Sequence, residues 1–154
     1  MRFILTSTML LVAIVATSAA VPSAAPGAMQ AELKWGPAPP VFPRGAEMAV
    51  MLGDPTGTGP FTVRLRMPDG YRIAPHTHPT DEHVTVVSGT FRVGMGRTAD
   101  TTKLKALAPG GVVTAPAGHA HYAAAQGETV VQVSAMGPFA LTYVNPADLP
   151  RAAR

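Results

Sequence analysis

The chain has 154 residues, with 12 lysines and arginines against 9 aspartates and glutamates and a formal net charge of +3. The basic residues are scattered, without a basic stripe or interleaved aromatic residues, which excludes the usual footprint of a nucleic-acid-binding protein. The absence of cysteine excludes disulfide bridges, thiolate metal ligands and a cysteine nucleophile.

The first 20 residues predict a secretory signal peptide. Arg2 gives a positive start, residues 3–16 are mostly apolar and residues 17–20 are small. The apolar run is too short for a good membrane span, and an uncleaved N-terminal anchor is the alternative. Residues 21–30 then form a flexible tether rich in small residues and proline, and residues 31–150 form one domain. We therefore expect a periplasmic or secreted protein that is free of the membrane after cleavage.

Short apolar runs separated by glycine and proline fill the domain. The 15 glycines and 16 prolines of the chain disfavour long helices. Apolar and polar residues alternate from Phe61 to Met67, the period of a half-buried strand. Many short strands at regular spacing predict an all-β antiparallel sandwich or barrel. We expect strands at Glu47–Leu52, Phe61–Met67, Arg72–His78, Glu82–Val87, Thr90–Met95, Leu104–Leu107, Val112–Ala115, His121–Ala124, Thr129–Ser134 and Ala140–Val144.

Glycine, proline and other turn-forming residues between these strands predict where the chain turns. Turns are expected at Gly53–Pro55, Pro68–Gly70, Ser88–Gly89, Pro109–Gly111 and Gln126–Gly127.

All five histidines lie between positions 76 and 121. His76 and His78 are two residues apart on an expected strand, so both side chains point to the same face. Glu82 follows after a bend, and if it faces the interior, His83 faces away and is the poorer ligand. This grouping of imidazoles and a carboxylate predicts a metal site.

A fourth ligand must come from elsewhere in the chain. His121 is the best candidate, because it follows the turn Pro116–Gly118, which can begin a new strand beside the first. Three imidazoles and one carboxylate suit a divalent transition metal (Mn, Fe, Co, Ni, Cu or Zn) rather than calcium or magnesium, which prefer all-oxygen ligands.

The spacing of these residues resembles the two sequence motifs of the cupin superfamily. The first motif is matched by Gly70, His76, His78, Glu82 and Gly89. The second is matched by Gly110, Pro116, Gly118 and His121. The family usually has a supporting asparagine shortly after this histidine, where the chain has Ala125.

The resemblance implies a single-domain jelly-roll β-barrel that binds one metal ion through His76, His78, Glu82 and His121. Four protein ligands on an octahedral ion would leave two positions for substrate, water or dioxygen. The metal's identity stays open among Fe, Mn, Ni, Cu and Zn. The alternative is an ion that only stabilises a barrel without cysteines.

Several residues near the predicted site have two interpretations. His119 is either a candidate catalytic residue or an exposed residue at the rim of the barrel. Thr80 and Asp81 either hydrogen-bond a ligand imidazole or only shape a turn. Arg72 shares the parity of His76, which would turn it to the interior, but an exposed position is favoured because Pro75 can break the alternation. Residues of the core or of a pocket are Phe61, Met67, Phe91, Met95, Phe139, Leu141 and Tyr143.

The sequence is compatible with three functions. The first is an exported metal-dependent enzyme acting on a small organic molecule, with dioxygenase-like chemistry favoured over lyase or isomerase chemistry, by analogy of fold. The second is a non-catalytic periplasmic protein that binds a small molecule or a metal. The third is a structural ion without either activity. An N-terminal arm around Trp35 further suggests a homodimer, since such arms often wrap a partner subunit in cupins.

Overall fold

A computed structural model describes residues 32–151, and the predicted signal peptide and tether lie outside the described residues. No helix in this part of the chain is long and apolar enough to cross a membrane. Its elements are β1 (Gly36–Pro37), β2 (Glu47–Leu52), β3 (Pro60–Met67), β4 (Arg72–Thr77), β5 (Glu82–Met95), the 3₁₀ helix η1 (Thr101–Lys103), β6 (Lys105–Leu107), β7 (Val112–Ala115), β8 (His121–Met136), β9 (Thr142–Tyr143) and the 3₁₀ helix η2 (Pro146–Asp148).

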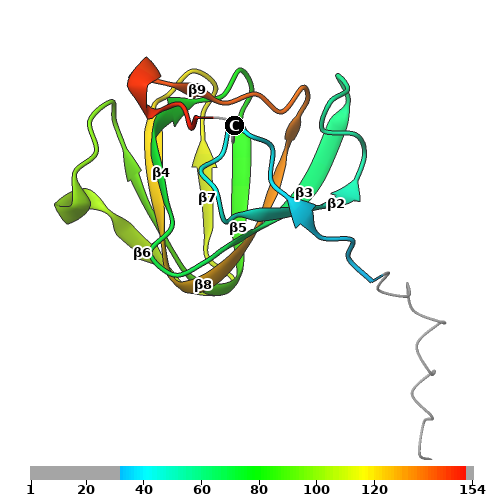
Figure 1. Ribbon diagram of the computed structural model, residues 1–154, viewed down its shortest axis with the longest axis horizontal. Helices are drawn as coiled ribbons and strands as arrows, with labels where there is room; N and C mark the ends of the chain where they lie inside the picture. The colour runs from blue at the N-terminus through cyan, green and yellow to red at the C-terminus, as the bar shows by residue number, and fades with distance from the viewer. Residues whose placement is uncertain (1–31, 152–154) are drawn as a thin grey trace, which may run out of the picture. The chain divides into compact units, whose positions relative to one another are not determined.

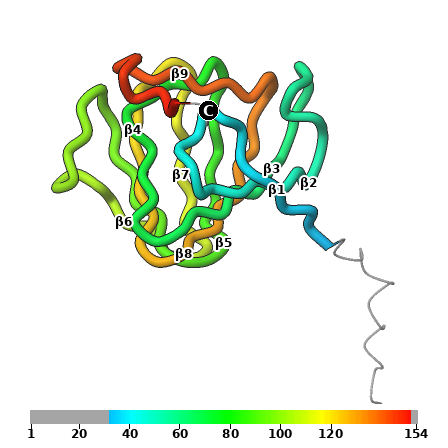
Figure 2. The backbone as a smooth tube through the Cα atoms, in the orientation of Figure 1, coloured from blue at the N-terminus to red at the C-terminus, as the bar shows by residue number. Residues whose placement is uncertain are grey.

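The strands form one curled antiparallel sheet around an apolar interior (Figure 1). The long strand β8 is its centre: its first part pairs with β4 and its second part with β3, while β5 runs along its other edge. Beyond β5 the sheet continues into β6 and β7. The backbone trace in Figure 2 shows these strands curving round to form the wall of a barrel. The all-β architecture expected from the sequence is confirmed.

Alternation along the strands builds the core. From Phe61 to Met67 every second residue of β3 is buried, as predicted. Cross-strand rows continue the pattern: Val133 of β8 lies opposite Val63 on β3 and Val84 on β5, and all three are buried. Burying one such side chain contributes about 1.5–3 kcal/mol, so rows of this kind stabilise a barrel that has no disulfide.

At two positions where the sequence predicts a turn, the chain continues as a strand. Gly89 and Gly127 both have positive φ angles, of 75° and 70°, which glycine adopts without steric penalty. They bend β5 and β8 while the pairing between the two strands resumes on either side. A Cβ at position 89 would overlap the carbonyl oxygen of Glu128. The predicted turns at Ser88–Gly89 and Gln126–Gly127 are therefore wrong, and each pair of expected strands is one long strand.

The expected N-terminal arm lies on its own domain. Gly36 and Pro37 pair with Met48 and Glu47 of β2, and the guanidinium carbon of Arg66 lies 4.0 Å from the centre of the Trp35 ring. The arm is thus in contact with β2 and β3 of its own chain.

Candidate metal centre

The fold brings the four predicted ligands together at one end of the barrel interior. His76 on β4 lies opposite His121, the first residue of β8, and His78 follows just after β4. Glu82 begins β5, and one of its carboxylate oxygens, Oε2, lies 3.5 Å from Nε2 of His78 and 3.3 Å from Nε2 of His121. All four side chains are buried.

The three imidazoles have the spacing of a metal-binding group. Ligand atoms of His76, His78 and His121 all lie within 4.8 Å of one another. The ring centres of His76 and His121 are 4.2 Å apart. These three histidines can therefore bind a metal ion, with Glu82 beside them as a carboxylate donor.

A bulge in β4 sets which side chains face inward. Ile73 pairs with Ala123, and the register then shifts before His76. Both Ile73 and His76 are buried, although strict alternation would place them on opposite faces, and Arg72 is exposed. The exposed orientation of Arg72, favoured because of Pro75, is thus confirmed.

Backbone carbonyls determine which imidazole nitrogen is free. Nδ1 of His76 lies 2.7 Å from the Ala74 oxygen, Nδ1 of His78 lies 2.8 Å from the Ala140 oxygen, and Nδ1 of His121 lies 3.2 Å from the His119 oxygen. A carbonyl oxygen only accepts hydrogen bonds, so each Nδ1 carries the proton and donates it. Each Nε2 then presents a lone pair to the interior, the arrangement in which a histidine binds a metal.

The electrostatics favour a cation at this point. Burial and the neighbouring His121 lower the pKa of His76 to about 3, and burial also lowers the pKa of His78 against the opposing effect of Glu82. Burial acts to raise the pKa of Glu82, but contact with His121 and His78 outweighs it and holds that pKa below its ordinary value. The lowered pKa values of His76 and His78 favour neutral imidazoles beside an ionised Glu82 carboxylate, which is an electron-rich group of donors.

One observation tests directly whether these residues fit a metal. Nε2 of His78 is buried and has no hydrogen-bond partner among the described residues. A buried polar atom without a partner is costly, and a metal ion between Nε2 and Glu82 would satisfy it. The donor set therefore fits a divalent transition metal.

Hydrogen bonds between turns hold the ligand-bearing segments in place. The Asp81 carboxylate accepts a hydrogen bond from the Ala117 amide at 2.8 Å, and the Gly118 amide donates to the His78 carbonyl at 2.9 Å. The Thr80 hydroxyl donates to the Met136 carbonyl at 2.8 Å. Thr80 thus bonds to the backbone at the end of β8 and Asp81 to the backbone of the turn before His121, which favours the turn-shaping interpretation of both residues.

The cavity beside the ligands is small, about 30 Å³. Its apolar wall includes Phe91, as the sequence allowed. The segment Gly137–Leu141, which we call the cover segment, supplies the half-buried residues Phe139 and Leu141 to this wall. The Phe139 ring is stacked on the ring of His78. Tyr143 lies behind His76 with ring centres 6.2 Å apart, whereas Met95 is exposed.

The two remaining histidines lie outside this cavity. His83 is exposed, as expected, and its Nδ1 is 3.0 Å from the Thr114 hydroxyl. His119 is also exposed, and its Nδ1 lies 3.2 Å from the Ala117 carbonyl within its own turn. It is not among the residues that line the cavity, and a catalytic role for it stays a prediction.

Comparisons with known proteins identify the class. The family model of the ChrR cupin-like domain matches residues 27–140, and the chain belongs to this family. The cupin resemblance and the jelly-roll barrel that it implied are thereby confirmed. No curated protein matches the sequence.

Solved structures agree on the fold. A putative acetylacetone dioxygenase from Methylibium petroleiphilum has a TM-score of 0.59 at 22% identity, over 78% of this chain and 81% of that chain. An RmlC-like cupin from Shewanella frigidimarina has a TM-score of 0.55 at 16% identity, over 71% and 87%. KdgF from Halomonas sp. has a TM-score of 0.51 at 20% identity, over 68% and 86%. At these identities the similarity concerns the fold alone.

Proposed function

We propose that this protein is an exported, metal-dependent enzyme that acts on a small organic molecule, with dioxygenase-like chemistry as the first reaction to test. The observation that carries the proposal is the convergence of the His76, His78 and His121 imidazoles and the Glu82 carboxylate inside a buried cavity. A divalent ion held there would act as a Lewis acid or bring oxygen and substrate together.

The chain's own residues would hold the ligands and exclude water. The carbonyls of Ala74, Ala140 and His119 orient the three imidazoles. A cavity of about 30 Å³ has room for about one water-sized molecule but not for an organic substrate. Entry of substrate therefore requires the cover segment to move, and closure afterwards would exclude water from the reaction.

The choice of a first substrate rests on likeness of fold. One similar structure is named a putative acetylacetone dioxygenase, so a β-diketone is the first compound to test on this chain. One fold hosts many reactions, and phenols and hydroxy acids complete the panel.

A non-catalytic binding protein is the second candidate, and the set of ionisable residues in the cavity wall favours it. Among the described residues that line the cavity, the ionisable ones are the four candidate ligands themselves, so no separate general acid or base is present in its wall. Such a protein would bind a metal or small molecule tightly and release it unchanged.

Oxygen uptake separates the two candidates. The protein would be produced without a histidine tag, assayed with the metal that it carries on purification, and given acetylacetone, catechol and a hydroxy acid. The enzyme proposal predicts substrate-dependent oxygen uptake that is lost in His76→Ala and His121→Ala. The exposed-histidine variant His83→Ala is the matched control and should retain it. Metal-loaded protein that turns over no compound of the panel would contradict the enzyme and leave the binder.

Export and assembly are part of the same proposal. Residues 1–20 motivate export to the periplasm or medium, and N-terminal sequencing of protein from the periplasmic fraction should begin near residue 20. A start at Met1 would contradict cleavage. A homodimer predicts, in light scattering, twice the mass of one cleaved chain, where the uncleaved chain has a mass of 15.9 kDa.

A further inference from the structure

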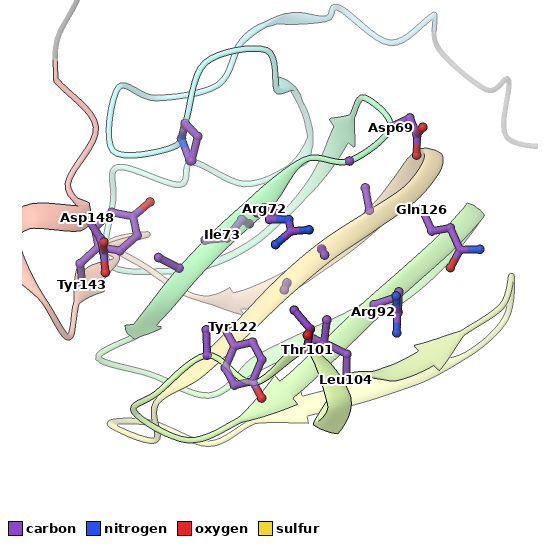
Figure 3. A pocket seen from close by; sticks show the side chains of 17 residues that line it. Asp69, Arg72, Ile73, Arg92, Thr101, Leu104, Tyr122, Gln126, Tyr143 and Asp148 are labelled. Atoms are coloured by element: carbon purple, nitrogen blue, oxygen red, sulfur yellow. The ribbon is translucent and has the colours of Figure 1, made fainter.

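The outer face of the sheet carries a second cavity, with a volume of about 550 Å³. It lies over β4, β8 and β5, and Figure 3 shows its lining side chains. We call it the outer groove. Residues that alternate with the interior ones form its floor, for example Ala124 beside the buried Ala123 and Ala125. Its volume is that of a typical small-molecule site.

Two arginines flank a small residue on this floor. In the pairing register, Ala124 of β8 lies opposite both Arg72 of β4 and Arg92 of β5. Figure 3 shows the two arginines on either side of β8. Neighbouring strands are about 5 Å apart, which places the two arginine backbones about 10 Å apart. Both guanidinium groups can therefore reach one group placed above Ala124.

The charges of this pair are not compensated. Neither Arg72 nor Arg92 has a carboxylate within 4.0 Å in the described part of the chain. Nε of Arg92 is buried and lacks any hydrogen-bond partner among those residues. Asp69 and Asp148 line the ends of the groove without pairing with the arginines. Two positive charges on the same face of the sheet repel each other, and an anion between them would remove that cost.

Apolar and aromatic residues complete the groove. Tyr122 and Leu104 form one side and Tyr143 lies toward the other (Figure 3). The Tyr122 hydroxyl donates to the Asp100 carbonyl at 2.9 Å and so ties the loop before η1 to the sheet. Gly94 makes this possible, because a Cβ there would overlap the Tyr122 ring. The wall is thus built by specific contacts of the chain.

We propose that the outer groove binds a small organic carboxylate. The carboxylate would lie above Ala124 and accept hydrogen bonds from Arg72 and Arg92, a pairing that suits the planar guanidinium group. The apolar body of the ligand would lie against Tyr122 and Leu104. This site is separate from the metal centre and does not depend on the metal or on catalysis.

Benzoate is the probe for this site, titrated into the Zn²⁺-loaded protein and followed through the backbone amides of Gly94 and Ala124 by NMR. Saturable shifts are expected with a dissociation constant of about 1 mM or below. Arg72→Gln and Arg92→Gln should each weaken binding about tenfold, the loss of one charged hydrogen-bonding partner. Arg64→Gln is the matched control, because Arg64 lies on β3 and its buried Nε also has no partner within residues 32–151. This variant should leave binding unchanged.

Two further ligands test the assignment. Benzamide has the same shape without the charge and should not bind, and phosphate has the charge without the apolar body and should bind more weakly than benzoate. The proposal is overturned if benzoate causes no saturable shift at these amides, or if the two arginine variants bind it as well as Arg64→Gln does. Equal affinity for phosphate would overturn the assignment to an organic carboxylate. Failure here leaves the metal centre unaffected, because that centre is tested by metal content and oxygen uptake.

Discussion

Phe139 lies flat on His78: their ring centres are 5.6 Å apart and their planes differ by 12°. The same segment supplies the Ala140 carbonyl that accepts the hydrogen bond from Nδ1 of His78. Phe139 also contacts Phe42 and Phe61 through tilted ring pairs. The cover segment therefore both orients a candidate ligand and closes the cavity above it.

Opening this cover is the first prediction. Phe139→Ala removes the ring over His78 and should admit imidazole, added as an external ligand, to the metal more readily than in the wild type. Because Phe139 is half-buried, the free energy of unfolding should fall by about 1–3 kcal/mol. Optical titration of the Co²⁺-loaded protein with imidazole, together with urea unfolding, measures both effects. Phe139→Leu keeps most of the cover, and equal imidazole affinity in the alanine variant and the wild type would refute the role of the segment.

Asp81 should influence metal affinity without touching the metal. Its carboxylate joins the bend before Glu82 to the turn before His121. Asp81→Ala should destabilise the fold by about 1 kcal/mol and weaken metal binding about tenfold, in the range seen for residues that orient ligands. Competition with a coloured chelator measures the affinity.

Asp54 provides the matched control for this experiment. It accepts hydrogen bonds from the amide and hydroxyl of Thr56 in an exposed turn, away from the ligands. Asp54→Ala should cost a similar amount of stability while metal affinity stays unchanged. If both variants lose metal to the same degree, Asp81 acts only through overall stability.

Gly94 should not tolerate a side chain. A Cβ at this position overlaps the Tyr122 ring, so Gly94→Ala must displace the ring and the loop that it holds. Overpacking of this kind costs about 1–3 kcal/mol, measurable by urea unfolding. Gly36→Ala is the control, because no atom of the described part of the chain lies within 4 Å of a Cβ there. An equal loss in both variants would contradict the explanation.

Stability should fall in alkaline solution because of two buried tyrosines. The hydroxyls of Tyr71 and Tyr143 donate to the carbonyls of Pro43 and Val41. Burial raises the pKa of Tyr71, and burial with a smaller effect of Asp148 raises the pKa of Tyr143 from 10.0 to about 12. Since the folded state holds these protons more tightly, their contribution is complete below about pH 10 and is lost as the pH rises toward 12 and above.

Urea midpoints at about pH 9 and about pH 11 test this dependence. The urea midpoint of the wild type should be lower at the higher pH than at the lower pH. The double variant Tyr71→Phe/Tyr143→Phe should be less stable at the lower pH and show a smaller fall. An equal fall in both proteins would assign the effect to other groups.

Local patterns predict the interior of the barrel and the grouping of the ligands. The alternation along β3 depends only on residues that are close together in the sequence. The same is true of the spacing of His76, His78 and Glu82. Contacts between distant segments do not leave such a signal. The stacking of Phe139 on His78 depends on where the cover segment crosses the barrel, and the sequence offers Phe139 only as a core or pocket residue.

Backbone irregularities explain the remaining differences between the structure and what the sequence predicts. The bulge before His76 decides that Arg72 faces outward, which alternation alone leaves open. Gly89 and Gly127 bend strands that the same residues, read as turn formers, would end. Arg92 is not distinguished from other surface arginines until the register places it and Arg72 on either side of Ala124.

The central claim is that His76, His78, Glu82 and His121 bind one divalent transition metal. The most direct test is elemental mass spectrometry of the untagged protein beside His76→Ala, His121→Ala and the exposed-histidine control His83→Ala. We predict about one ion of Fe, Mn, Ni, Cu or Zn per chain in the wild type and in His83→Ala, and a loss of that metal in the other two. Metal-free wild type, or equal metal content in all four proteins, would contradict the claim.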